Sequence, residues 1–213
     1  RIKKFKLILE VEEVYSDVTG DKYTRRNEVK FLQQADAYIL PTKLLSDEVN
    51  PSRKPEVIIH GTYKVEPYEK YNLFHKNSQN DSGQIIHCVY AGTLDHRKGG
   101  AIAAATAAEF LPSNYHVHIL GFGSEKDINK MKDLIEKISL KSRAKITYDG
   151  VLSGEDYIRF IQSCNIGLST QDPNEAFNGT SFPSKILSYM ANGLRVVSIR
   201  IPAIEMSDIG HMI

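Results

Sequence analysis

NEAFNGTSFPSKILSYMANGLRVVSI, residues 174–199, combines a polar loop, a helix start, an apolar helix and a strand in one segment. Pro183 suits the first turn of that helix, because its missing N–H removes no hydrogen bond there. Gly193 should end the helix, and residues 194–199 then predict a buried strand. One helix face should be buried, because apolar residues recur at helical spacing: Ile186, Leu187, Met190 and Ala191. A helix followed directly by a buried strand indicates an α/β fold.

Lys185 conflicts with the rules of helix ends. A cation in the first turn opposes the positive end of the helix dipole, at a cost of about 0.3–1 kcal/mol. An anion bound to the free N–H groups of that turn would remove the conflict. Thr180 and Ser181, directly upstream, are residue types that cap helices. A solvated surface lysine would also explain Lys185, because so small an effect is tolerated.

The composition is that of an ordinary soluble globular protein. The chain has 213 residues, of which 41% are hydrophobic and 25% charged, and its formal net charge is +1. It therefore has no bulk charge for nucleic acid or an anionic membrane. Cys88 and Cys164 lie far apart in apolar segments, which predicts two reduced, buried thiols and a cytoplasmic protein. No metal site is predicted, since His116 and His118 share a strand face without an evident third ligand.

Residues 1–65 alternate strands with helices, which predicts parallel strands joined by crossover helices. The predicted strands are 5–11, 37–40 and 56–60, with helices over 26–34 and 43–48 and an acidic, polar loop over 12–17. The chain enters its first strand almost at once and without a methionine. We therefore expect a segment of a larger protein that begins with the end of one Rossmann-like domain. Residues 66–83 are polar and irregular, which predicts a linker or long loop.

Residues 84–213 begin a second series of strands and helices. The predicted strands are 85–91, 117–120, 145–148, 166–169 and 194–199, and helices over 101–110, 125–140 and 153–162 and the helix of the opening segment alternate with them. The chain stops without a closing helix, so we expect this domain to be truncated. The predicted fold class is α/β, with two Rossmann-like, doubly wound parallel-sheet domains, the first of them incomplete.

Three segments rich in glycine, hydroxyl or lysine residues follow strands of the second domain. They are residues 92–100 after the first strand, 121–125 after the second, and the helix start 180–185 after the fourth. In a doubly wound sheet such segments converge at the carboxyl ends of the strands, where nucleotide phosphates bind. Ordinary turn chemistry explains any one of these glycines. Their order and positions together favour the anion site at Lys185.

Three motifs lie in these segments: G-x-L-x-x-x-K-G, G-x-G-x-E and a helix end with a following strand. The residues that carry them are Gly92, Leu94, Lys98 and Gly99, then Gly121, Gly123 and Glu125, then 189–197. With these motifs the chain resembles the GT-B glycosyltransferases of the large retaining group called family four. The resemblance spans nearly all of the chain. One departure is Thr93, which stands where that family usually has an arginine.

The resemblance implies transfer of a sugar, with retention and without a metal or other required cofactor, from a UDP- or GDP-sugar to a glycan or lipid-linked acceptor. It implies that three cations stabilise the leaving diphosphate: Lys98, Lys185 and Arg97. The residues that it places at the donor are Gly92, Thr93, Gly121, Gly123, Gly150, Val151, Glu175, Thr180, Ser181, Phe182 and Ser188. Glu12 and Glu13 would face the acceptor, although a solvated acidic loop explains them equally well. The implied setting is polysaccharide biosynthesis, and peripheral membrane association of the full-length protein stays open.

Two further departures keep an alternative open. The two glutamates of the family's closing motif fall on Thr180 and Ser188, and neither residue is acidic. Ser188 would hold a ribose more weakly than a carboxylate does. A catalytically degenerate nucleotide-binding or protein-interaction module of the same fold is therefore the alternative. A GT-B-like epimerase or phosphorylase would need catalytic carboxylates or a cofactor lysine, and the sequence shows no such pattern.

Overall fold

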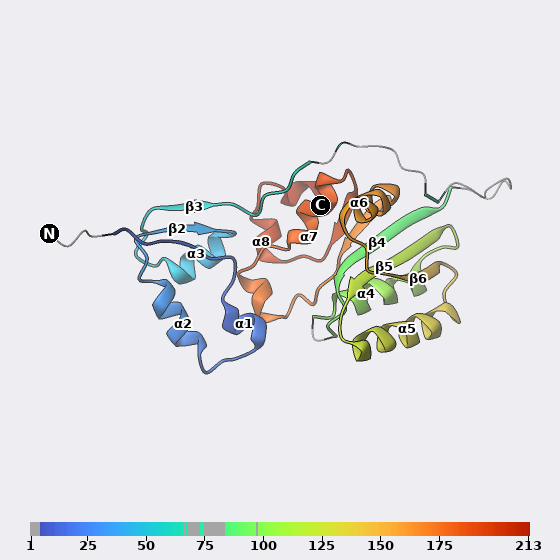
Figure 1. Cartoon of the computed structure of the whole chain (residues 1–213), viewed down its shortest axis with the longest axis horizontal. Coiled ribbons are helices and arrows are strands. Elements are labelled where there is room, and N and C mark those ends of the chain that lie inside the picture. The colour runs from blue at the N-terminus through green and yellow to red at the C-terminus, as the bar shows by residue number, and fades with distance from the viewer. Residues whose placement is uncertain (1–4, 66, 68–72, 75–83, 97) are drawn as a thin grey trace. The chain divides into compact units, whose positions relative to one another are not determined.

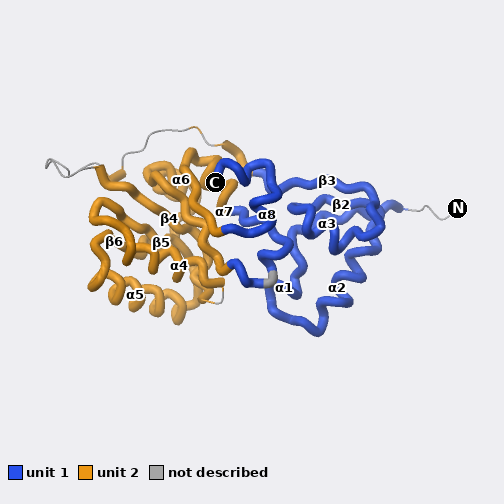
Figure 2. The backbone as a smooth tube through the Cα atoms, turned by 180° about the vertical axis from the view of Figure 1, so that it is seen from behind, with its two compact units in different colours: residues 1–62, 173–184, 200–212 blue, residues 63–172, 185–199, 213 orange. Residues whose placement is uncertain are grey.

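The computed structural model describes residues 5–65, 67, 73–74, 84–96 and 98–213 (Figure 1). The chain forms two compact units (Figure 2). Unit 1 comprises Arg1–Thr62, Pro173–Ser184 and Arg200–Met212, and unit 2 comprises Tyr63–Asp172, Lys185–Ile199 and Ile213. The sequence pattern predicts one domain over 84–213, whereas the structure groups 173–184 and 200–212 with unit 1. The division into an acceptor-side and a donor-side domain stays a prediction, and most of the predicted linker lies outside the described residues.

Unit 1 is built on a parallel sheet of three strands in the order β1-β2-β3. Its elements are β1 (Ile8–Glu10), α1 (Tyr15–Thr19), α2 (Arg25–Leu32), β2 (Ala37–Leu40), α3 (Lys43–Val49), β3 (Glu56–Ile58), η3 (Ala176–Gly179), α8 (Pro202–Glu205) and η4 (Gly210–Met212). The core packs Tyr38 and Leu40, alternate residues of β2, against Val14, Leu45 and Val49. Parallel strands with intervening helices confirm the predicted fold class for this unit.

Helix α1 was not predicted, because the sequence pattern of 12–17 indicates a polar loop. The carboxylate of Glu28, on α2, accepts hydrogen bonds from the N–H groups of Tyr15 (2.7 Å) and Ser16 (2.9 Å). A carboxylate at this position satisfies N–H groups that lack partners within the helix, and the helix dipole favours it. The loop prediction is therefore wrong at residues 15–17, since the group that stabilises the helix start comes from another element.

Unit 2 contains a parallel five-stranded sheet in the order β6-β5-β4-β7-β8. Its elements are β4 (Ile86–Thr93), α4 (Gly100–Ala107), η2 (Ala108–Phe110), β5 (Tyr115–Phe122), α5 (Glu125–Ser139), β6 (Lys145–Gly150), α6 (Gly154–Ser163), β7 (Ile166–Ser169), all but the first residue of α7 (Ser184–Ala191), and β8 (Arg195–Ser198). The chain moves from β4 outward to β6 and then resumes on the other side of β4 with β7. The strand order therefore reverses beside β4, and open α/β sheets bind ligands at such a switch point.

Two helical layers cover the two faces of this sheet (Figure 1). On one face the small side chains of α4 and the apolar stripe of α5 pack against alternate residues of β5, in a core that includes Ala101, Ala104, Ala105, Val117, Ile119, Met131 and Ile138. On the other face α6 and α7 pack against β4 and β5 through Val89, Leu120, Ile161, Cys164 and Tyr189. The predicted doubly wound sheet is confirmed.

Tyr189 is the centre of the buried face of α7. Its ring lies so close to Gly167 that a Cβ on this glycine would come within 2.3 Å of the ring, and its hydroxyl accepts a 2.8 Å hydrogen bond from the N–H of Ala91. The prediction for this face is wrong for three residues that are only half-buried: Leu187, Met190 and Ala191. The space for Tyr189 exists because a strand elsewhere in the chain carries a glycine. Gly193 ends the helix as predicted, with φ +78°.

Cys88 and Cys164 are buried and unpaired, as predicted. Burial raises the pKa of the Cys88 thiol to about 11. Within the described part of the chain, no helix has both the length and the apolar composition that crossing a membrane requires.

Candidate functional site

The carboxyl ends of β4 and β5 form the floor of the candidate site. Gly92 and Gly121 are register partners on these strands, and Thr93 pairs with Phe122. A Cβ on Gly121 would lie 1.9 Å from the carbonyl oxygen of Gly92, so the close approach of the two strands requires glycine. Gly92 and Thr93 are the last residues of β4 and not part of the predicted loop, because pairing with β5 continues through them.

The side chain of Lys185 lies across Gly92. A Cβ on Gly92 would come within 2.5 Å of Lys185 Cε and 3.0 Å of its Nζ, and Nζ lies 5.3 Å from the centre of the Tyr90 ring. Burial, and then the positive charge of Lys98, lower the pKa of Lys185. No carboxylate among the described residues forms an ion pair with this amine. A solvated surface lysine is thereby contradicted, because Lys185 is half-buried.

Lys98 lies in the loop between the end of β4 and the start of α4. Residues that follow β7, the neighbouring strand on the other side of the switch point, form hydrogen bonds with this loop. The carbonyl oxygen of Lys98 accepts a 3.3 Å hydrogen bond from the N–H of Asp172, which follows β7. The hydroxyl of Thr170 donates a 2.7 Å hydrogen bond to the carbonyl of Gly100. Gly99, with φ +65°, turns the chain into α4. The residues after β4 and after β7 therefore form one joined rim.

A cavity of about 210 Å³ lies beside the two register-paired glycines. It is lined by Ala91, Gly92, Leu120, Gly121, Phe122, Val151, Leu152 and Tyr157. Phe122 and Val151 are 60% and 61% exposed, so the cavity has an apolar edge that is open to solvent. Gly150, with φ +80°, turns the chain from β6 toward this edge. A mostly apolar cavity with backbone polar groups at its floor suits a flat heterocycle.

Tyr157 links this cavity to α7. Its hydroxyl is hydrogen-bonded to that of Ser188, and burial raises the pKa of Tyr157. Ser188 lies three residues after Lys185, which places both on one side of α7. Unit 2 thus places Gly92, Gly121 and Val151 beside one cavity, with Lys185 over Gly92 and Ser188 hydrogen-bonded to Tyr157. Three other residues of the cavity lining were not predicted: Phe122, Leu152 and Tyr157. Two of them directly follow residues that were, since Phe122 follows Gly121 and Leu152 follows Val151.

A second cavity, of about 380 Å³, lies at the start of α5 and is lined by Thr93, Asp95, His96, Phe122, Gly123, Ser124 and Asp127. Ser124 Oγ accepts a 3.2 Å hydrogen bond from the N–H of Asp127 and donates a 2.6 Å hydrogen bond to its carboxylate. The hydrogen bond from Ser124 lowers the pKa of Asp127. This helix start already holds a carboxylate, so it suits a neutral group better than a phosphate.

Four predicted donor residues belong to unit 1: Glu175, Thr180, Ser181 and Phe182. The carbonyl of Thr180 accepts a hydrogen bond from the hydroxyl of Thr42, and Phe182 stacks on His60 at 4.6 Å between ring centres. The hydroxyl oxygens of Thr180 and Ser181 are buried and form no hydrogen bond with the described residues. Buried hydroxyls without partners are uncommon and call for a ligand or an ordered water.

The predicted acceptor-side residues lie in unit 1. Glu12 and Glu13 are exposed between β1 and α1, where they suit the acceptor role and the solvated-loop reading equally. Arg97 lies outside the described residues.

A group of histidines lies away from these strand ends. His87 on β4 joins His116 and His118 on β5, with one ligand atom of each ring within 4.8 Å of the others. The premise that His116 and His118 lack a third ligand is therefore wrong. His87 is a strand-interior residue, as predicted, but the cross-strand register places it beside them. Burial, and then the charge of His118, lower the pKa of His116 to about 3, so that this ring is neutral at neutral pH.

The fold defined by these two units is that of the GT-B glycosyltransferases. No family model matches the sequence, and no curated protein matches it. Among solved structures, Anabaena HepE in complex with UDP-glucose aligns with a TM-score of 0.64 at 16% identity, over 91% of this chain and 53% of that chain.

Two other solved structures are similar. The sucrose-phosphate synthase of Thermosynechococcus elongatus has a TM-score of 0.59 at 14% identity, over 92% of this chain and 51% of that chain. The pneumococcal O-GlcNAc transferase GtfA, in complex with UDP and GlcNAc, has a TM-score of 0.56 at 13% identity, over 92% and 38%. The chain spans about half the length of HepE and of the sucrose-phosphate synthase. At these identities the similarity shows the fold alone.

Proposed function

We propose that this chain is the donor-binding part of a glycosyltransferase that uses a nucleoside-diphosphate sugar. The observation that carries the proposal is Lys185, a half-buried cation beside Lys98 with no carboxylate partner among the described residues. It lies over Gly92 at the carboxyl end of β4, the strand beside which the strand order reverses. A diphosphate is the ligand class that supplies the missing negative charge. HepE and GtfA, which share this fold, were solved with UDP.

The same cations would serve the reaction. When the sugar leaves, negative charge develops on the diphosphate, and groups already in place stabilise it most effectively. We assign this role to Lys98 and Lys185, with Arg97 in support. Because two neighbouring lysines would supply the positive charge, we propose that the transfer needs no metal ion. It proceeds with retention, in keeping with the family resemblance.

We assign the nucleoside to the cavity beside Gly92 and Gly121. The base would lie against Phe122 and Val151, with backbone groups of Gly121 and Gly150 at its edge. The hydroxyl of Ser188, which is hydrogen-bonded to Tyr157, would contact the ribose. Thr93 and Gly123, which line the second cavity together with Phe122, would complete the donor site in the proposal. Since the walls are apolar and the polar groups belong to the backbone, the cavity favours a planar ring without fixing its identity.

The wider setting of the activity is proposed from the resemblance. Glu175, Thr180, Ser181 and Phe182 would contact the sugar and phosphates, and the two unpaired hydroxyls among them support this role. Glu12 and Glu13 would face a glycan or lipid-linked acceptor. The proposed enzyme is a hexosyltransferase of polysaccharide biosynthesis in the cytoplasm, with peripheral membrane association of the full-length protein left open.

Calorimetric titration of the folded chain with UDP, GDP and UDP-glucose tests the donor assignment. Replacing Lys185 with Met should weaken nucleotide binding by roughly 10- to 100-fold, because a hydrogen bond to a charged group contributes about 1.5–3 kcal/mol. Lys130→Met, on the exposed side of α5, is the matched control and should bind normally. The proposal fails if no nucleotide binds to the folded chain, or if both variants bind equally well.

A catalytically degenerate binding module remains the second candidate, because Thr180 and Ser188 replace two glutamates of the family motif. The two candidates differ in turnover. A degenerate module would bind the donor with Lys185-dependent affinity but would release no UDP from UDP-sugar, even with the full-length protein and a range of glycan acceptors. Slow UDP release that Lys98→Met abolishes would identify an enzyme.

A further inference from the structure

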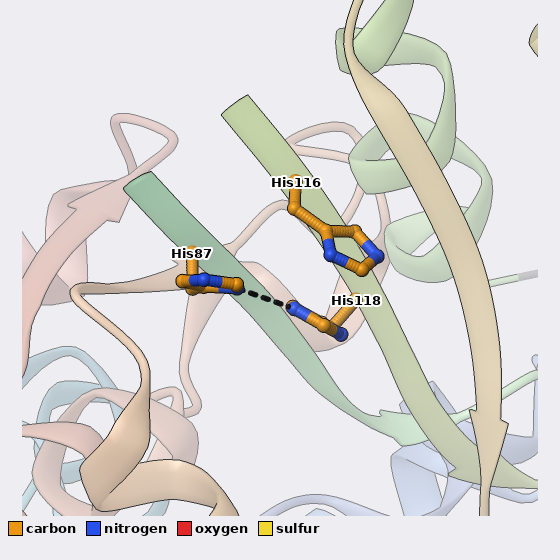
Figure 3. Close-up of side chains that lie close together, drawn as sticks. All are labelled: His87, His116 and His118. Carbon is orange, nitrogen blue, oxygen red and sulfur yellow. Dashed lines mark hydrogen bonds between the residues drawn. The ribbon is translucent and has the colours of Figure 1, made fainter. Parts of the chain in front are cut away.

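The three histidines meet because of strand pairing. His116 and His118 are two residues apart on β5, so their side chains leave the same face of the sheet. His87 on β4 is the register partner of His116. All three are buried, with exposures of 8%, 8% and 1% for His87, His116 and His118. Figure 3 shows the rings converging from the two strands, with the hydrogen bond between His87 and His118.

Hydrogen bonds to β6 set the proton positions on two of these rings. The hydroxyl of Thr147 donates to the carboxylate of Asp149 at 2.8 Å, so it accepts from His116 Nε2 at 2.9 Å. The same carboxylate oxygen accepts from His118 Nδ1 at 3.1 Å. Each ring therefore carries its proton on the nitrogen facing β6. The lone pairs of His116 Nδ1 and His118 Nε2 are left on the side where the three rings meet.

The third ring closes the group. His87 Nδ1 lies 2.9 Å from His118 Nε2, and since this Nε2 carries a lone pair, the N–H at His87 Nδ1 donates the hydrogen bond. In a tetrahedral zinc site with Zn–N bonds of about 2.0–2.1 Å, two ligand nitrogens are roughly 3.3 Å apart. The His87 and His118 nitrogens, 2.9 Å apart, are slightly closer than this, and no two ligand atoms of the group are more than 4.8 Å apart. Small ring rotations would bring the three nitrogens to one ion.

We propose that His87, His116 and His118 form a binding site for a divalent transition-metal ion, with zinc as the best match. Three neutral imidazoles with a fourth position for solvent are a known zinc ligand set. Asp149 bonded to His118, and Thr147 bonded to His116, supply the outer hydrogen bonds that orient metal-binding histidines. On binding, the ion replaces the proton between His87 and His118. That proton moves to the other ring nitrogen of His87, so no net proton is released.

The cover of the site is apolar. Phe74 stacks on His87 at 4.1 Å and on His118 at 5.0 Å, and Phe160 of α6 meets the His118 ring edge-on at 5.2 Å. Aromatic rings limit solvent access, which strengthens the attraction between an ion and its ligands. His118 lies three residues before Gly121 on β5, or roughly 10 Å along the strand. The ion would therefore bind apart from the donor cavity and would stabilise the β4–β5–β6 part of unit 2 without entering the transfer reaction.

Metal content and affinity of the tag-free, full 213-residue chain test the proposal. After exposure to zinc and desalting, emission spectrometry should find one ion per chain. A chelator should remove it and lower the thermal unfolding temperature. Cobalt(II) in place of zinc should give the visible absorption bands of a tetrahedral or five-coordinate nitrogen site. A wild-type chain that binds no zinc or cobalt overturns the proposal.

Variants identify the ligands. His118→Gln and His87→Gln should each abolish the cobalt spectrum, whereas His211→Gln, an exposed histidine elsewhere in the chain, should leave it unchanged. Thr147→Val retains all three ligands and should weaken zinc binding by about 10- to 100-fold. Thr147→Val also tests the metal site if His118→Gln or His87→Gln does not fold. Unchanged affinity in Thr147→Val, or in folded His118→Gln and His87→Gln, overturns the assignment.

Discussion

Alanine at position 92 tests the contact between Gly92 and Lys185. The added Cβ would lie 2.5 Å from Lys185 Cε, where non-bonded carbons normally keep about 3.5–4.0 Å. Lys185 must therefore retreat by roughly 1 Å. The two nearest atoms are the end of the flexible Lys185 side chain, and the third is the Tyr90 hydroxyl at 3.1 Å, which must give by a few tenths of an ångström. Since Gly92 does not adopt a left-handed conformation and no backbone atom obstructs the methyl group, the backbone need not move.

The expected result separates binding from stability. Displacing the amine should cost most of a charged hydrogen bond to phosphate, about 1.5–3 kcal/mol, which weakens UDP binding by roughly 10- to 100-fold. The free energy of unfolding should change by less than about 1 kcal/mol. Gly121→Ala should behave in the opposite way. Its Cβ would lie 1.9 Å from a backbone oxygen, so β4 itself must shift, at a cost of at least about 1–3 kcal/mol of stability.

Titration calorimetry with UDP and urea unfolding of both variants measure the two effects. Gly179→Ala is the stability control, because its methyl group would meet nothing within 4 Å. In the double variant Gly92→Ala with Lys185→Met, the second substitution should add little, since both act on one contact. Full additivity, or normal UDP affinity in Gly92→Ala, would refute the contact as the cause.

Three further predictions concern pH and buried hydrogen bonds. UDP affinity should fall as pH rises through the lowered pKa of Lys185, because the neutral amine attracts phosphate less, and titrations of Lys185→Met should lack this fall. Burial raises the pKa of Glu56, but hydrogen bonds from Lys43, Ser46 and Asn50 outweigh it and hold that pKa at about 2, against 4.5 for the free side chain. The Glu56 carboxylate therefore stabilises the fold above pH 4.5, by at most about 3 kcal/mol before solvent screening, and this contribution is lost as pH falls toward 2. In Glu56→Gln the free energy of unfolding, measured with urea, should depend less on pH across that range. An unchanged pH dependence would contradict a role for these hydrogen bonds. Tyr189→Phe should cost about 1–3 kcal/mol in urea unfolding, because the N–H of Ala91 is left without its acceptor, and a loss below 0.5 kcal/mol would show that the bond contributes little.

Much of the fold is legible in local sequence. The alternation of apolar strands with amphipathic helices predicted the parallel sheets, and Ala37–Leu40 and Ile166–Ser169 were predicted with the observed bounds. Helix α1 was not, because the carboxylate at its start comes from Glu28 on another helix. Gly92 was assigned to a loop because glycine usually ends a strand, whereas here it lets β5 and Lys185 approach.

The sequence by itself determined the α/β class, the order of the strands along the chain, and the glycine and lysine residues at their carboxyl ends. These depend on the period of apolar residues and on turn chemistry, which act over a few neighbouring residues. Only the tertiary structure decided that Lys185 lies over Gly92, that Tyr189 fills the space at Gly167, and that His87 joins His116 and His118. Those meetings depend on the register between strands and on the packing of helices against them, and both arise from contacts between residues far apart in the chain.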